Sequence, residues 1–318
     1  MSLSPVSHVR IGVLSVLLLP ASLLAQDRND DAHPRFLGPL ASGGQTLPKG
    51  MVNIEPYLIN STSASRFDAD GHRLDSDAPP QWDLVIPINV GVTDRLTLGT
   101  TLAGQYDQGA DGRRDLVIGD TSVKAQYSVY ASAEGHRTAW SVTAQRGLPT
   151  GRHDRLQYTD RAGSGSGAQT TALSVQGQAY FLDGMLRGRA VAGWGLPGSG
   201  AGIRGQSVYG TAAGFNGSAR LGSTFSTSVA AEYSVHPHWT LVAEALYEQG
   251  RGAHVSGVMA DGAALDRRDP ASWRLSVLPA VEYHFNDQVG VIGGVQLGVA
   301  GRNTTAIVAP QVALNVAF

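Results

Sequence analysis

Apolar and polar residues alternate at every second position along most of this chain. In the last such stretch, 304–318, Val308, Val312 and Leu314 fall on one side and Gln311 on the other. Successive side chains of a β-strand point to opposite faces, so this period predicts strands with one apolar and one polar face. No stretch shows a convincing helical period. The chain is therefore expected to be all-β.

Twelve stretches show this alternation, and each has about the length needed to cross a bilayer as a tilted strand. They cover residues 51–60, 83–92, 95–106, 121–130, 137–145, 170–182, 185–196, 223–235, 238–248, 273–285, 288–299 and 304–318. Hydrocarbon offers no hydrogen-bond partner to backbone amides, so strands span a membrane only as a closed sheet. The pattern predicts a transmembrane antiparallel up-and-down β-barrel of about twelve strands.

Short and long connections alternate between these stretches. The short ones are 93–94, 131–136, 183–184, 236–237 and 286–287. The long ones are 61–82, 107–120, 146–169, 197–222 and 249–272, and only the last link, 300–303, breaks the pattern. Outer-membrane barrels place short turns in the periplasm and long loops outside the cell, so we expect this topology here.

The N-terminus has the order of a secretory signal. The apolar run 11–25 follows Arg10, precedes a polar stretch and is too short to span a bilayer comfortably. We expect cleavage after Ala25, with retention as an anchor the alternative. This divides the chain into a signal peptide (1–25), an N-terminal periplasmic segment (26–49) and a barrel (50–318) in the cell outer membrane.

Composition narrows the expected partners. The chain has no cysteine, so it carries neither disulfides nor a lipid anchor on a cysteine. A formal net charge of −2 and the lack of a basic stripe argue against nucleic acid. The expected partners are outer-membrane lipid and a small-molecule solute, with no cofactor, and the oligomeric state is left open.

The chain ends on Phe318, which shares the apolar face of its stretch with Val316 and Leu314. A terminal strand of this kind resembles the recognition signal read by the barrel-insertion machinery of Gram-negative outer membranes. The alternative is an ordinary buried edge strand that happens to end on Phe. Together with the export signal and the loop pattern, Phe318 predicts a membrane-facing terminus.

Four segments carry a family resemblance: TLPKGMVNIEPY (46–57), VGVTDRLTLGT (90–100), GDTSVKAQYSV (119–129) and GLPTGRHD (147–154). They resemble a family of outer-membrane proteins named after the MetA pathway of phenol degradation, whose members are labelled transporters. The resemblance implies a pore-like barrel for an unassigned small solute, with hydrophobic or aromatic compounds suggested by the family label. It transfers no catalytic residues.

If the apolar faces point to lipid, the ionisable residues on the opposite faces line the interior. These lumen-lining candidates are Glu55, Lys124, Arg187, Arg189, Glu232, Glu244, Glu248, Arg274, Glu282 and His284. Acids and bases fall on different walls, and such a cross-lumen field would orient a polar or zwitterionic solute. The alternative is that these charges neutralise one another in a water-filled or plugged interior.

The sequence predicts a passive channel or transporter for small solutes. One alternative is a filled structural or surface-interaction barrel without transport. Another, an outer-membrane hydrolase, is disfavoured because His236, His238 and His284 would lie at the periplasmic end, and the loop histidines lack an evident Ser at triad spacing. We therefore predict no enzyme activity and no catalytic residues.

One long loop has acidic residues at spacings that raise the question of calcium. The segment FDADGHRLDSD (67–77) brings Asp68, Asp70, Asp75 and Asp77 close to His72. It lacks the full ligand register and the closing Glu of an EF-hand loop. Loop composition explains the segment better, so we predict no metal site.

Overall fold

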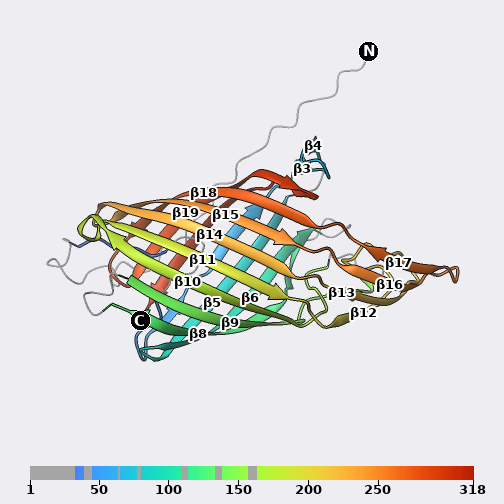
Figure 1. Ribbon diagram of the computed structural model, residues 1–318, viewed down its shortest axis with the longest axis horizontal. Coiled ribbons are helices and arrows are strands. Elements are labelled where there is room, and N and C mark those ends of the chain that lie inside the picture. Colours follow the sequence, from blue (N-terminus) through green and yellow to red (C-terminus); the bar gives the residue numbers. More distant parts are fainter. Residues whose placement is uncertain are drawn as a thin grey trace, which may run out of the picture.

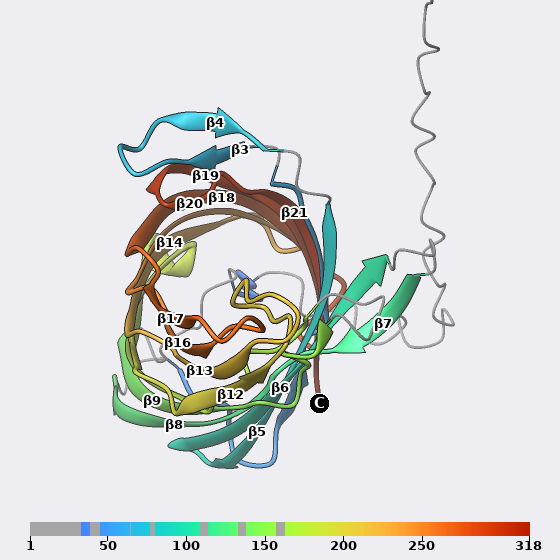
Figure 2. The ribbon, with the colours of Figure 1, turned by 90° about the vertical axis from the view of Figure 1, so that its right-hand side faces the viewer.

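The chain forms a closed barrel of twelve antiparallel strands (Figures 1 and 2). The computed structural model describes residues 33–38, 45–63, 65–76, 80–108, 114–132, 138–156 and 163–318. The predicted signal peptide and its cleavage site lie outside these residues. Each of the twelve predicted stretches contains a strand of the barrel wall, which confirms the predicted fold class.

The first wall strand is split into β1 and β2 at Glu55 and Pro56. In order around the ring the wall contains β1 (Val52–Ile54) with β2 (Tyr57–Ser61), β5 (Gln81–Thr93), β6 (Leu96–Gln108), β8 (Thr121–Ala131), β9 (Thr138–Leu148), β10 (Thr170–Phe181), β11 (Leu186–Leu196), β14 (Thr224–His236), β15 (Trp239–Gly250), β18 (Ser272–His284), β19 (Val289–Arg302) and β21 (Val308–Ala317). Between β10 and β11 the chain makes a 3₁₀ turn, η3 (Leu182–Gly184).

The C-terminal strand closes the ring against the first one. Asn53 lies opposite Ala317 on β21, and Tyr57 lies opposite Ala313. Phe318 and Val52 exchange two backbone hydrogen bonds of 2.7 and 2.9 Å. The closed ring leaves no free sheet edge in the wall, as a hydrocarbon environment requires.

The distribution of polar and apolar side chains in the barrel is the reverse of that in a water-soluble protein. Its outer face is apolar, with Leu98 45% and Val229 58% exposed. Its inner face is polar, and Glu232 and Glu282 are fully buried there. Phe318 is 62% exposed and continues the apolar face of β21. A band of exposed large apolar side chains around a polar interior is the pattern of a membrane barrel.

Within the described residues, no helix is long and apolar enough to cross a membrane.

The short and long connections gather at opposite ends of the barrel, which we call the short-turn end and the long-loop end (Figure 1). Several long connections contain strands that the alternation did not predict. These are β3 (Ser65–Phe67), β4 (Arg73–Asp75), β7 (Arg114–Ile118), β12 (Gly200–Arg204), β13 (Asn216–Arg220), β16 (His254–Val258) and β17 (Ala264–Arg268). The predicted stretch 304–318 is divided into a two-residue strand outside the wall, β20 (Thr304–Thr305), and the wall strand β21.

The four strands β12, β13, β16 and β17 form a separate loop sheet across part of the long-loop mouth (Figure 2). It has its own apolar core, in which Ile203, Phe215 and Val255 are almost fully buried. The strands β20, β3 and β4 make a smaller sheet at the same end. β7 pairs only with the end of β6, and the two swing away from the ring (Figure 2).

Candidate functional site

The barrel encloses a cavity of about 680 Å³ within its lumen. Five charged residues line it: Glu55, Lys124, Arg189, Glu244 and Asp287. Neutral amides contribute most of the remaining polar surface, namely Gln45, Asn53, Asn89, Gln126, Gln145, Gln296, Gln311 and Asn315. Apolar patches come from both sides of the lumen, among them Val85, Pro87, Leu246 and Leu278. The cavity therefore offers charges of both signs, many amides and some apolar wall.

Residues 33–38, which precede the first strand, lie inside the barrel near its short-turn end (Figure 2, blue). The backbone N–H groups of Leu37 and Gly38 donate to the two carboxylate oxygens of Glu282, at 2.9 and 3.1 Å. The Thr240 hydroxyl donates to the carbonyl oxygen of Arg35 at 2.9 Å. These contacts hold the segment on the wall formed by β15 and β18.

Aromatic and close backbone contacts fix the same segment. Phe36 packs edge-on against Tyr180 with 5.8 Å between ring centroids, and the Arg187 guanidinium lies 4.8 Å from the Phe36 ring. Gly38 has φ +123°, and a Cβ there would lie 2.4 Å from Nη1 of Arg189. Only glycine fits this position without displacing Arg189.

Residues 45–50 lie against another wall, formed by β5, β6 and β8. The Leu47 N–H donates to the Thr97 hydroxyl at 2.8 Å, and the Thr46 hydroxyl donates to the Asp94 carbonyl at 2.9 Å. The Gln126 amide reaches the Gln45 carbonyl at 3.3 Å. The two described stretches before the first strand therefore occupy separate walls of the lumen and narrow it.

Six of the ten predicted lumen residues are engaged with partners on the inner wall. Arg187 and Glu232, on neighbouring strands, form a bidentate ion pair of 2.6 and 2.7 Å. Across β18 and β15, Nε and Nη2 of Arg274 donate to a single oxygen of Glu248, at 3.1 and 2.6 Å. Nε2 of His284 lies 3.2 Å from the Glu282 carboxylate. At these positions the charges neutralise one another or hold the N-terminal segment.

The other four predicted residues, Glu55, Lys124, Arg189 and Glu244, are those that line the cavity. Arg189 is 4.0 Å from Glu232, so it joins the edge of the paired network. Lys124 has no hydrogen bond and no ion pair within 4 Å among the residues that the structure describes. It is the one predicted inward cation of the described chain that lacks such a partner.

Sequence reasoning missed the contribution of the N-terminal segment and of the amides. Phe36, Leu37 and Gln45 lie outside any alternating stretch, so the period gave no signal for them. Asn89 and Gln311 do fall on inward positions of their strands, and the same alternation would have found them. The prediction of lumen-lining residues included only ionisable side chains, so these two amides were not part of it.

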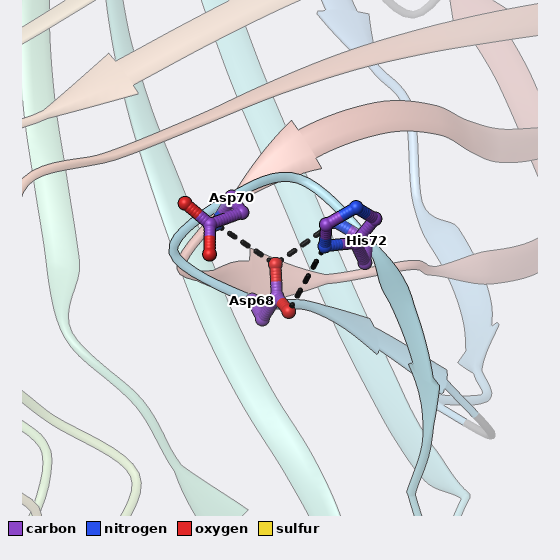
Figure 3. A group of neighbouring side chains, drawn as sticks. All are labelled: Asp68, Asp70 and His72. Carbon is purple, nitrogen blue, oxygen red and sulfur yellow. Dashed lines mark hydrogen bonds and ion pairs between the residues drawn. The ribbon is translucent and has the colours of Figure 1, made fainter.

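The acidic loop segment forms a turn between β3 and β4 (Figure 3). Ligand atoms of Asp68, Asp70 and His72 lie within 4.8 Å of one another. One Asp68 oxygen accepts the backbone N–H groups of Asp70 and His72, at 2.8 and 2.9 Å. The His72 N–H is the main reason that the pKa of Asp68 lies below its usual value. The Asp68 carboxylate thus serves the turn itself.

The histidines named for the hydrolase alternative contact aromatic rings, backbone and, at His284, the Glu282 carboxylate. His236 and His238 stack with 5.7 Å between ring centroids at the short-turn end. Nδ1 of His238 lies 2.6 Å from the carbonyl oxygen of His284. In the loop sheet, His254 pairs with Asp266 at 2.8 Å.

Comparison with solved structures places this fold among outer-membrane barrels. An outer membrane channel from Pseudomonas putida F1 is 17% identical, with a TM-score of 0.65 over 89% of this chain and all of the other. The NanC porin is 8% identical over 83% of this chain and 98% of the other, with a TM-score of 0.46. The Pseudomonas putida toluene transporter TodX is 12% identical over 85% and 89%, with a TM-score of 0.40.

The first of these likenesses establishes the fold, and the other two are too distant to inform function. No protein-family model matches the chain, and no curated protein matches it. The resemblance to the family named after the MetA pathway stays a prediction. The chain has the fold of an outer-membrane channel.

Proposed function

We propose that this protein is a passive outer-membrane channel for small solutes, exported by a cleaved signal peptide. The observation that carries the proposal is the polar cavity of about 680 Å³ inside a barrel whose outer face is apolar. An apolar outside needs lipid, and a polar lumen lets water and solutes pass. No cofactor or energy source is needed for diffusion along this path.

In this proposal the short-turn end faces the periplasm and the long-loop end faces the outside, as in other barrels of this type. The N-terminal segment then lies at the periplasmic end of the path, and the loop sheet covers part of the external mouth (Figure 2). Both features narrow the route, which fits small solutes. The terminal residues Leu314, Val316 and Phe318 would be read by the insertion machinery during assembly.

One observation favours a second function, a filled barrel without transport. Residues 33–38 and 45–50 both occupy the lumen, and several inward charges are already paired. In that case the loop sheet would bind a partner outside the cell.

The aromatic or other hydrophobic solutes implied by the family resemblance belong to the channel proposal, and apolar wall at Val85 and Leu246 is compatible with them.

Ion conductance in planar bilayers separates the two functions. We expect the purified full-length protein to give discrete current steps. A filled barrel gives none. Heat-modifiable gel migration is the control for folding, because an intact barrel migrates differently before and after boiling. Folded protein that produces no steps would overturn the channel proposal.

A further inference from the structure

The four residues 35–38 (RFLG) lie on the inner wall through contacts that follow one another along the segment. Two anchor groups of the wall, the Thr240 hydroxyl and the Glu282 carboxylate, are fully buried. Thr240 donates to the carbonyl oxygen of Arg35 at 2.9 Å, and Glu282 accepts the N–H groups of the last two residues at 2.9 and 3.1 Å. These bonds use only the backbone of the segment, so the wall recognises a peptide backbone whatever its side chains.

The first side chain of the segment has a basic site of its own. Arg35 is only 7% exposed. Its guanidinium donates to the Asp287 carboxylate and, from Nη1 at 3.4 Å, to the carbonyl oxygen of Pro237. A buried guanidinium needs a carboxylate and further acceptors to offset the loss of water. This part of the wall therefore selects a basic residue.

The second side chain lies in an aromatic site. The Phe36 ring packs against Tyr180, and the Arg187 guanidinium lies 4.8 Å from the centroid of the same ring. Arg187 is held by its bidentate pair with Glu232, a contact in which the segment takes no part. The guanidinium is therefore in position even without Phe36, and its charge favours an aromatic ring beside it.

The third side chain enters an aliphatic site. Leu37 packs against the buried cluster of Val242, Ile292 and Ala313. Gly290 on β19 gives this side chain its room, because a Cβ at that position would lie 2.7 Å from Cδ2 of Leu37. A single methyl group on the wall would therefore fill part of the site.

A free molecule reaches the same wall from the cavity. Phe36, Leu37 and Gly38 border the cavity of about 680 Å³. The groups that hold the segment lie on the strands from β10 to β19 and the turns between them, far from it in the chain. None of the contacts depends on a covalent link to the segment. Basic, aromatic and aliphatic sites in succession, with backbone anchors beside them, fit a peptide better than a single amine or a single aromatic ring.

We propose that this wall is a binding site for short peptides that carry a basic, an aromatic and an aliphatic side chain in succession, and that residues 35–38 occupy it as a tethered competitor. This inference rests on the proposed channel function and names a solute class for that channel. The tether lowers the apparent affinity for a free peptide, because the peptide binds only while the wall is vacated.

The test measures binding of acetyl-Arg-Phe-Leu-Gly-amide to the detergent-solubilised full chain by titration calorimetry. Phe36→Ala weakens the tether and leaves the wall unchanged, so we expect it to bind the peptide about tenfold more tightly than the wild type does. Peptides with alanine in place of the arginine or of the phenylalanine should each bind at least about tenfold more weakly than the parent peptide. Leu37→Ala weakens the tether in the same way and serves as a second variant.

A matched pair of glycine variants assigns the binding to this wall. Combined with Phe36→Ala, Gly290→Ala places a methyl group in the aliphatic site and should weaken peptide binding about tenfold. Gly293→Ala on the same strand is the control, because its Cβ would meet nothing within 4 Å. Heat-modifiable migration checks that each variant is folded. Absence of binding to both tether variants, equal binding of all three peptides, or binding that Gly290→Ala leaves unchanged would overturn the site.

Conductance separates this site from the channel itself. The same peptide, added to the Phe36→Ala protein in a planar bilayer, should interrupt the open current, because the site lies in the path. Conductance without peptide binding refutes the peptide site and leaves the channel standing. Peptide binding without conductance refutes the channel and leaves a peptide site inside a closed barrel.

Discussion

Two parts of the inner wall carry inward charges and use them differently. Arg187 on β11, Glu232 on β14 and Glu282 on β18 are almost fully buried. Arg187 and Glu232 form an ion pair, and Glu282 accepts a hydrogen bond from the N-terminal segment. On β8, Lys124 faces the cavity and has no hydrogen bond and no ion pair within 4 Å among the described residues. An inward charge therefore does not by itself mark a solute path. A charge can contribute to the path only where it is not already paired within the protein.

The strand register explains the difference. Arg187 lies directly opposite Glu232 on the next strand, and Glu248 lies directly opposite Arg274. Lys124 lies opposite Gly99 on β6, which has no side chain, and opposite the neutral Gln145 on β9. Neighbouring opposite charges neutralise each other locally, whereas a charge beside glycine stays available to the lumen.

Removing the carboxylate of the buried Arg187–Glu232 pair should have the largest effect, which is on the stability of the barrel. Glu232→Gln would leave Arg187 buried without its carboxylate, and we expect a loss of about 3 kcal/mol in the free energy of unfolding. Urea unfolding in lipid vesicles measures it. The control is Glu248→Gln at a carboxylate that is 41% exposed, where the loss should stay below about 1 kcal/mol. Equal losses in both variants would contradict the distinction between the two pairs.

Loosening the N-terminal segment should change the channel more than the fold. Glu282→Ala removes both acceptors for the Leu37 and Gly38 N–H groups. Hydrogen bonds to charged groups contribute about 1.5–3 kcal/mol, so we expect the detached population to rise about tenfold or more. Single-channel recording should show more frequent or larger openings. Unaltered openings in folded protein would mean that the segment does not limit the path.

Neutralising Lys124 should shift ion selectivity by a smaller amount. Removing one positive charge from the lumen changes the energy of a nearby ion by about 1 kcal/mol in a watery pore, or about fivefold in relative permeability. We expect Lys124→Met to raise the cation-to-anion permeability ratio, read from the reversal potential in a salt gradient. Lys49→Met is the control. A ratio that moves equally in both variants would remove Lys124 from the path.

The smallest effect concerns pH at the short-turn end. Partial burial would raise the pKa of Asp287, but the hydrogen bond and charge of Arg35 outweigh it, so this pKa lies below the usual value. A carboxyl whose pKa is lowered on folding contributes stability above its unfolded pKa and loses it as the pH falls through the folded one. Arg35 belongs to the N-terminal segment, so protonation of Asp287 weakens one of the contacts that hold this segment. Channel openings should therefore become more frequent as the pH falls below the usual pKa of an aspartate.

Asp287→Asn tests this dependence. At neutral pH the variant should already behave like the acidified wild type, and acid should change it less. The measurement is opening frequency against the pH of the solution at the short-turn end. A variant with the full pH response of the wild type would assign that response to other groups.

Much of the fold follows from the sequence because each strand carries its own signal. The alternation at 304–318 or 273–285 needs no knowledge of the rest of the chain, and all twelve wall strands are found in this way. Short loop strands such as β12 and β16 were not predicted, because they are only five residues long and depend on pairing within the loop sheet.

The lumen site was harder to predict from the sequence, because its contacts join distant parts of the chain. Leu37 and Glu282 are separated by 245 positions, and no local pattern in either segment announces their contact. The inward placement of Lys124 follows from the alternation alone. Its lack of a partner depends on which residue lies opposite in the register, and that becomes visible only when the strands are paired.

The central claim is that the solute path runs through the cavity beside Lys124. The chain contains no cysteine, so a single introduced thiol is unique. Thr101→Cys places it on the cavity wall, and Ala263→Cys places it on an exposed turn of the loop sheet as the control. We predict that a charged methanethiosulfonate reagent reduces the current through the Thr101→Cys channel and leaves the Ala263→Cys channel unchanged. A Thr101→Cys channel that mass spectrometry shows to be modified, yet whose current is unaffected, would contradict the account.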